Sequence, residues 1–110
     1  MKDMAPADLF ERINGATPPL ILDVRSGAEF DAGHIPGSIH IPFWAVPWRA
    51  ADLPVGADHP VVVYCGHGPR ALFARAVLRR RGFTRVACLA GHMASWRRAG
   101  YREDRVNPEP

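Results

Sequence analysis

Short apolar runs alternate with amphipathic segments along this chain, and the alternation predicts strands and helices in turn. The apolar runs lie between proline, glycine or polar residues, as is typical of buried strands. Strands are predicted at residues 20–24, 38–41, 61–64 and 85–89. Helices are predicted at residues 6–14, 26–32, 70–81 and 93–99, several of them with a glycine at the end.

Local signals support two of these elements. Val61-Val62-Val63-Tyr64 is β-branched almost throughout, which predicts a central strand. Ser26 stands three residues before Glu29, the spacing of a capping box at the start of a helix. Both signals are local, so they locate elements without saying how these pack.

The segment 43–53 has no clear pattern, because Pro47 interrupts a stretch rich in tryptophan and alanine. No element is assigned to it. Its aromatic part, Phe43 to Trp48, is predicted either to pack over the sheet or to form a lip or partner-docking patch beside a site.

Strands that alternate with helices over short connections imply an α/β domain with a mainly parallel sheet. In such folds, ligands bind beyond the carboxyl ends of the strands. Cys65 directly follows the predicted central strand, so it lies at that place. We therefore expect the functional chemistry at Cys65.

The residues after Cys65 predict an activated thiol. Gly66 and Gly68 allow backbone conformations with positive φ, so successive amides can point inward and form an anion-binding nest. The helix that begins near Arg70 adds free N–H groups and the positive end of its dipole. These surroundings favour a thiolate that attacks as a nucleophile and forms a covalent intermediate. Cys88, inside a predicted strand, is expected to be a buried structural residue.

Four ordered motifs carry a family resemblance. They are Leu22-Asp23-Val24-Arg25 with Glu29-Phe30, Gly33-His34-Ile35-Pro36-Gly37-Ser38-Ile39-His40-Ile41-Pro42, Cys65-Gly66-His67-Gly68-Pro69-Arg70, and Gly91 with Met93 and Trp96. The third resembles the C-x-x-G-x-R active-site loop of rhodanese-like domains, and the others are similar to further signatures of that family. The resemblance implies a three-layer domain with a five-stranded, mainly parallel sheet flanked by helices. It also implies that Cys65 carries sulfur as a persulfide.

The other candidate site residues have narrower expected roles. Arg70 would orient an anionic donor, and His67 either tunes the thiolate or projects into solvent. The resemblance suggests mostly structural polar contacts for Asp23 and Arg25 at the pocket floor. His92 stands where family members often carry a second glycine, and it is expected either to lie on the surface or to edge the pocket.

The expected reaction moves sulfane sulfur from an anionic donor such as thiosulfate to a thiol, cyanide or protein acceptor. The amides from Gly66 to Arg70 would hold the persulfide, and no metal or organic cofactor is required. Zinc is disfavoured because Cys65-x-His67 is tighter than the usual spacing of structural zinc ligands. A phosphatase is a weaker alternative because its loop resembles C-x5-R, whereas only four residues separate Cys65 from Arg70. A non-catalytic binding or regulatory module of the same family is the other alternative.

Length and composition limit the remaining possibilities. The 110 residues suit one domain, with a core at about 5–101 and a polar tail at 102–110 that is expected to be frayed. Neither a secretory signal nor an apolar run long enough to span a membrane is found, and the two cysteines are expected to be reduced. A cytoplasmic monomer is therefore expected. The net charge of +3 reflects either solvated helix faces or attraction of small anions, and no nucleic-acid motif accompanies it.

Overall fold

A computed structural model describes residues 3–106 and has an α/β architecture built on a parallel sheet. The strands are β1 (Leu20–Asp23), β2 (Ile39–His40), β3 (Val61–Tyr64) and β4 (Val86–Cys88). Their order across the sheet is β2-β1-β3-β4, and every neighbouring pair is parallel. β3 is therefore an interior strand, as its β-branched sequence predicts, and all four of its residues are buried.

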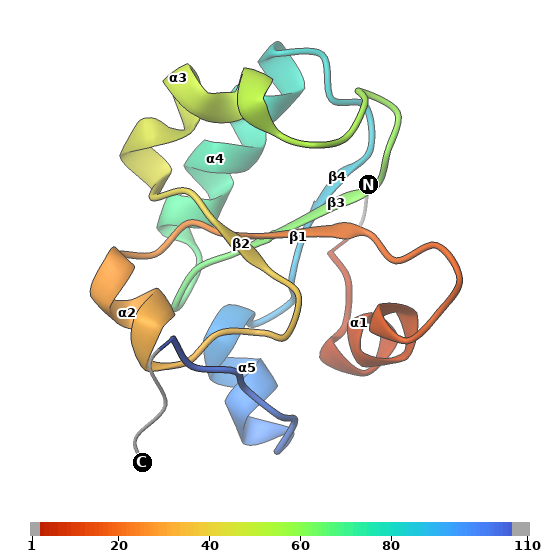
Figure 1. Ribbon diagram of the computed structural model, residues 1–110, viewed down its shortest axis with the longest axis vertical. Helices are drawn as coiled ribbons and strands as arrows, with labels where there is room; N and C mark the ends of the chain where they lie inside the picture. The colour runs from red at the N-terminus through yellow and green to blue at the C-terminus, as the bar shows by residue number, and fades with distance from the viewer. Residues whose placement is uncertain (1–2, 107–110) are drawn as a thin grey trace.

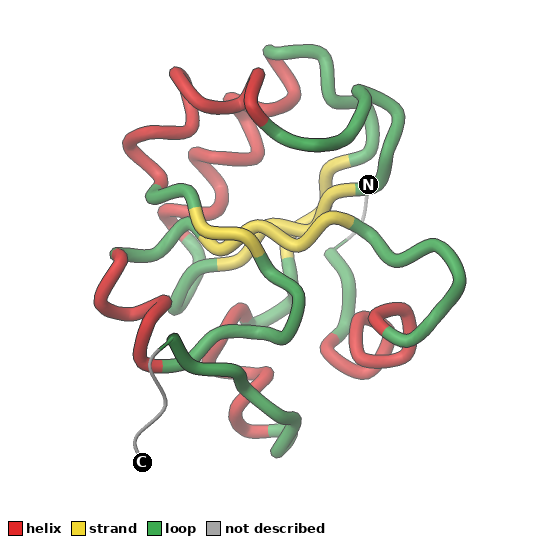
Figure 2. The backbone as a smooth tube through the Cα atoms, viewed as in Figure 1, coloured by secondary structure: helices red, strands yellow, loops and turns green. Residues whose placement is uncertain are grey.

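Helices cover both faces of the sheet, which gives three layers (Figure 1). The helices are α1 (Pro6–Ile13), α2 (Gly27–Ala32), α3 (Val46–Arg49), α4 (Pro69–Arg80) and α5 (His92–Arg98). α3 and α4 lie on one face, and α1, α2 and α5 lie on the other (Figure 2). The predicted helices and strands are confirmed, with ends that differ by one or two residues.

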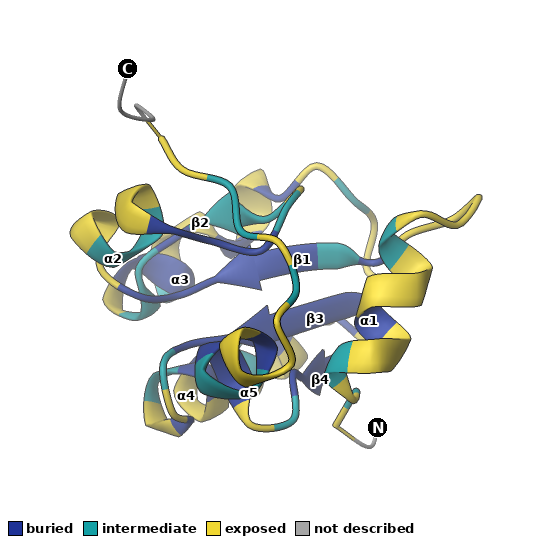
Figure 3. Cartoon of the chain, turned by 90° about the horizontal axis from the view of Figure 1, so that it is seen from below, coloured by how far each residue is buried: buried dark blue, intermediate teal, exposed yellow. Residues whose placement is uncertain are grey.

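The core follows the two-residue period of the strands. Leu22 and Val63 point into a cluster that includes Ala74 and Leu78 of α4. The alternate residues of the same two strands point to the opposite face of the sheet. They belong to a second cluster, which α1 and α5 cover. β1, β3 and β4 are thus buried on both sides, β2 is half-buried, and the outer faces of the helices are exposed (Figure 3).

The expected number of strands is wrong, because the described residues form a four-stranded sheet. Met4 lies beside β4 and makes a single parallel bridge with Leu89. The Met4 amide donates to the Cys88 carbonyl at 2.8 Å, and the Met4 carbonyl accepts from Ala90 at 2.8 Å. Pro6 begins α1 two residues later, so the chain turns into a helix before a fifth strand can form.

The unassigned segment 43–53 is helical. It forms a 3₁₀ turn at Phe43–Ala45, then α3, then a second 3₁₀ turn at Ala50–Asp52. Val46 is buried, but Trp44 and Trp48 are 63% and 75% exposed, so the expectation that this aromatic segment packs over the sheet is wrong for both tryptophans.

The start of the C-terminal tail is packed rather than frayed. His34 and Asp104 form an antiparallel bridge, and the Trp96 indole N–H donates to the Arg102 carbonyl at 3.0 Å. Residues 107–110 of the predicted tail lie outside the described residues. Within residues 3–106, no helix combines the length and the apolar character needed to cross a membrane.

Candidate active site

The loop from Cys65 to Gly68 joins β3 to α4 at the carboxyl edge of the sheet. Gly68 is the N-cap of α4 and has a φ of 141°, a conformation that side chains other than hydrogen rarely permit. Pro69 then occupies the first turn of α4, where a missing N–H costs no helical hydrogen bond. The backbone thus reverses within four residues of the strand end and wraps around Cys65.

Backbone amides converge on the sulfur of Cys65. The Gly68 amide donates to Sγ at 3.0 Å, and the Ala71 amide is a further donor to this thiol. Burial alone would raise the pKa of Cys65, but a hydrogen bond from the His92 side chain and those from the two amides outweigh it and lower the pKa to about 7. Half of the thiol population is therefore a thiolate near neutral pH.

The identity of the amide donors differs in part from the expectation. The donors were expected among Gly66 to Arg70, and Gly68 fits that range. Pro69 has no amide hydrogen, and Ala71 lies one residue beyond the range. The first turn of α4 therefore supplies a donor that the glycine motif alone does not indicate.

Backbone amides in the first turn of α5 donate to carbonyl groups of the Cys65 loop. The Met93 amide donates to the Cys65 carbonyl at 2.9 Å, and the Ala94 amide donates to the Gly66 carbonyl at 3.4 Å. These contacts keep the loop carbonyls away from the sulfur. The Cys65 amide itself donates to Nδ1 of His92 at 3.3 Å. His92 is buried, so the expectation that it lies on the surface is wrong; it contacts the loop, but it is not among the residues that line the cavity beside it.

Arg70 is held over the loop by Glu29. Its Nη1 donates to Glu29 Oε1 at 2.7 Å and its Nη2 donates to Oε2 at 3.3 Å. The same Glu29 carboxylate completes the predicted capping box of α2 with Ser26. The hydrogen bond from Arg70 is the main reason that the pKa of Glu29 falls to about 2. Arg70 Nη2 also lies 3.3 Å from where a Cβ atom of Gly66 would stand, so the guanidinium crosses directly over the glycine.

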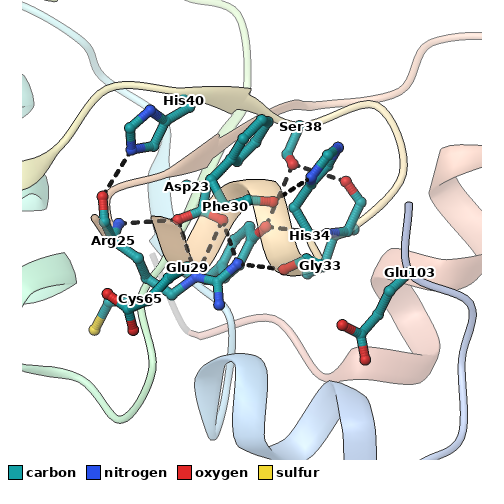
Figure 4. A network of polar contacts seen from close by, with 12 residues as sticks. Asp23, Arg25, Glu29, Phe30, Gly33, His34, Ser38, His40, Cys65 and Glu103 are labelled. Atoms are coloured by element: carbon teal, nitrogen blue, oxygen red, sulfur yellow. Dashed lines mark hydrogen bonds and ion pairs between the residues drawn. The ribbon is translucent and has the colours of Figure 1, made fainter. Parts of the chain in front are cut away.

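A second ion pair lies beneath the loop. Arg25 donates through Nε and Nη2 to the two carboxylate oxygens of Asp23, with the shortest contact at 2.7 Å, and both side chains are buried (Figure 4). Arg25 Nη2 also donates to the Gly33 carbonyl at 2.6 Å, which ties the end of α2 to the end of β1. These contacts are the structural polar contacts that the sequence predicts for Asp23 and Arg25.

A cavity of about 160 Å³ opens beside the loop. Its lining consists of Arg25, Glu29, Gly66, His67, Arg70, Met93, Ala94 and Arg97. Each of its three arginines is paired with a carboxylate: Arg25 with Asp23, Arg70 with Glu29 and Arg97 with Glu103. A guanidinium carries five N–H donors, so these groups still have N–H groups to offer an anionic ligand. Cavities that take drug-sized ligands measure about 300–1,000 Å³, so this one suits a small ion.

Sequence reasoning found most of the site but missed two charged residues. Glu29 was expected only as a helix cap and as part of a family signature, without a role at the site. Arg97 was not singled out from the sequence, yet it lines the cavity, and its Nε donates to Glu103 at 3.0 Å. Its position four residues after Met93, one helical turn, was the signal that could have found it. His67 is exposed and lines the cavity.

Comparison with known proteins agrees with this geometry. A family model described as a rhodanese-like domain matches residues 5–99. The chain belongs to the rhodanese-like domain family. A solved structure of a rhodanese-related protein from Thermoplasma volcanium superposes with a TM-score of 0.82 at 30% identity, over 94% of this chain and 98% of that one. The rhodanese-like α/β fold predicted from the motifs is thereby confirmed.

Two relatives of this rhodanese-like chain have names that state an activity. A protein named sulfurtransferase from Allochromatium vinosum is 35% identical over 84% of this chain and 84% of its own length. A thiosulfate sulfurtransferase GlpE from Stutzerimonas stutzeri is 40% identical over 71% of this chain and 70% of its own length. The chain is therefore similar to sulfurtransferases of the rhodanese type.

Proposed function

We propose that this protein is a sulfurtransferase that carries sulfane sulfur as a persulfide on Cys65. The observation that carries the proposal is the set of amide donors on Cys65 Sγ, together with the pKa of about 7 for that thiol. A thiolate is the nucleophilic form of cysteine, and the same donors suit the anionic outer sulfur of a persulfide. The names of the sulfurtransferase relatives support the same reaction class.

The first half-reaction loads sulfur onto the protein. The Cys65 thiolate attacks the outer sulfur of thiosulfate and forms a new S–S bond. The S–S bond of thiosulfate breaks, and its electron pair leaves with sulfite. The negative charge then resides on the outer sulfur of the persulfide, about 2 Å beyond Sγ. Arg70 and Arg97, on the cavity lining, favour the approach of the anionic donor.

The second half-reaction removes the outer sulfur. Cyanide or a thiolate attacks that sulfur, the Cys65–S bond to it breaks, and the electron pair returns to Cys65 as a thiolate. No electrons are gained or lost by the protein, so the cycle needs neither a metal nor an organic cofactor. A cellular thiol or a protein that accepts sulfur is the physiological counterpart of cyanide in this proposal.

The cavity supports thiosulfate over bulkier donors, because it is small and guanidinium groups line it. The four-residue spacing between Cys65 and Arg70 keeps the loop short, which favours one sulfur over a tetrahedral phosphate. We further propose that the protein acts as a monomer in the reducing cytoplasm, since both cysteines are free thiols.

The test is the intact mass of the reduced protein after incubation with excess thiosulfate. We expect a gain of one sulfur atom that cyanide removes, and no gain in a Cys65→Ser variant. If thiosulfate gives no gain, a mercapto-acid and a protein persulfide should be tried as donors. Failure with all three would overturn the enzymatic proposal and leave the non-catalytic module as the function.

A further inference from the structure

His92 is a buried imidazole that touches the Cys65 loop on two sides. It begins α5 with a φ of 55°, and only 7% of it is exposed. Nδ1 accepts the Cys65 amide at 3.3 Å. Nε2 faces Gly68 and lies 3.4 Å from where a Cβ atom of that residue would stand. One side of the ring thus holds the Cys65 backbone, and the other lies against the residue whose amide binds the sulfur.

The amide contact determines where the ring carries its hydrogen. A ring nitrogen that accepts an N–H has no hydrogen of its own, so the neutral imidazole carries its hydrogen on Nε2. That N–H faces the Gly68 side of the loop, where the Gly68 amide donates to Cys65 Sγ at 3.0 Å. The backbone holds the ring in place, because the His92 amide donates to the Leu89 carbonyl at 3.0 Å and the next amide donates to Cys65.

We propose that His92 is a positioning residue for sulfur transfer: its Nδ1 holds the Cys65 backbone, and its Nε2–H adds a donor to the amides that favour an anionic sulfur. The effect on turnover rests on the proposed function, whereas the effect on the thiol does not. The lowering of the Cys65 pKa by the His92 side chain agrees with this role.

The other ionisable groups near the thiol are already engaged or neutral. Arg70 of α4 acts on Cys65, but its guanidinium binds Glu29 of α2. The Cys88 thiol of β4 is protonated near neutral pH, because burial raises its pKa. Arg97 of α5 lines the cavity and binds Glu103. His67 lines the cavity from the loop itself. His92 therefore differs from these groups by touching the Cys65 backbone directly.

Two substitutions separate the two sides of the ring. His92→Gly removes the whole ring and suits a φ of 55°, so we expect the variant to fold. His92→Asn keeps a short acceptor for the Cys65 amide and tolerates the left-handed conformation, but it has no group at the Nε2 position. His59→Asn is the matched control, because His59 lies on another loop and contacts the Pro18 carbonyl at 3.3 Å.

The measurements are the thiolate absorbance of Cys65 against pH, in a Cys88→Ala background, and the rate of sulfur loading from thiosulfate. The parent should titrate at about pH 7. Both His92 variants should titrate about one pH unit higher, and at neutral pH they should load sulfur roughly fivefold more slowly, in proportion to the thiolate fraction. The difference in loading rate between the parent and the His92 variants should become smaller at high pH, where Cys65 is a thiolate in every variant. His59→Asn should match the parent.

The outcomes separate this proposal from the proposed function. Titration and loading like the parent in both variants would show that His92 has no such role, even though the protein is a sulfurtransferase. Impairment of His92→Gly alone would overturn the part assigned to Nε2–H. If the parent loads no sulfur from any donor, the proposed function fails, while the shift in the titration midpoint still decides whether His92 acts on the thiol.

Discussion

Cys65 follows β3 and Cys88 lies in the neighbouring parallel strand β4; the two side chains are identical, yet their surroundings shift their pKa values in opposite directions. Both are fully buried, and both belong to the core cluster on the α4 side of the sheet. Burial raises the pKa of Cys88, which lies inside β4 opposite Val63. At Cys65 the same effect is outweighed by hydrogen bonds, and the pKa falls to about 7.

The difference arises from position along the strand. In β4, the amide of the residue after Cys88, Leu89, donates to the Val63 carbonyl of β3, so it is directed along the sheet rather than toward the Cys88 thiol. Beyond the end of β3, no strand partner is required, and the amides of the following loop and helix turn toward Sγ. Burial therefore does not distinguish a structural cysteine from a nucleophile, whereas the number of N–H donors on the sulfur does.

The largest expected effect is on enzyme activity, where substitutions at the two cysteines should differ most. Cys65→Ser should lower thiosulfate:cyanide sulfurtransferase activity by at least roughly 10³-fold, because it removes the nucleophile. Cys88→Ala should keep activity within about twofold and lose about 1 kcal/mol of stability from the small cavity. A steady-state assay and thermal unfolding of both variants check this. Loss of activity in a folded Cys88→Ala variant would contradict the assignment of the two thiols.

A second effect is on the pH dependence of stability. The pKa of Cys65 in the folded protein is about 7, below its ordinary value of 9.0. Ionisation of this thiol therefore stabilises the folded protein fully above about pH 9, and the stabilisation is lost as pH falls through 7. The difference in unfolding free energy between wild type and Cys65→Ser should therefore grow by about 2 kcal/mol from pH 7 to pH 9.

Cys88 has the opposite sign and serves as the control. The pKa of Cys88 is raised, so the contribution of this protonated thiol to the stability of the folded protein is present below the ordinary thiol pKa. That contribution is lost as pH rises beyond it. The difference in unfolding free energy between wild type and Cys88→Ala should become smaller above about pH 9. Urea unfolding at several pH values measures both profiles. Parallel profiles for the two variants would show that the two thiols do not differ as inferred.

The smallest effect concerns the charged rim of the cavity beside Cys65. Arg70→Lys loses the two-pronged contact with Glu29, so the KM for thiosulfate should rise by about tenfold. Stability should change by less than about 1 kcal/mol, because both side chains are partly exposed. The control is Arg75→Lys on the same helix, whose 3.4 Å pair with Asp3 lies outside the cavity lining. Equal KM values for the two variants would exclude a donor-binding role for Arg70.

Some features of the fold follow from local sequence and were predicted correctly. Val61 to Tyr64 forms an interior strand because β-branched residues fit a doubly buried sheet, and Ser26 with Glu29 caps α2 as the spacing predicts. The fifth strand was expected from the resemblance, and it fails because Pro6 starts a helix early. The segment 43–53 was left without an element because proline and tryptophan carry no period, although its turns are helical.

The sequence by itself determined the order of strands and helices, the place of Cys65 beyond a central strand, and the glycine turn that reverses the chain around it. These features depend on neighbouring residues, through side-chain period, capping and allowed backbone angles. Only the tertiary structure decided that Glu29 holds Arg70 and that His92 contacts Cys65. Those contacts join residues 27 or more positions apart, whose approach depends on how the helices pack on the sheet. No local pattern indicates these contacts, because the sequence around a polar side chain on a helix is the same whether the side chain faces water or a neighbouring loop.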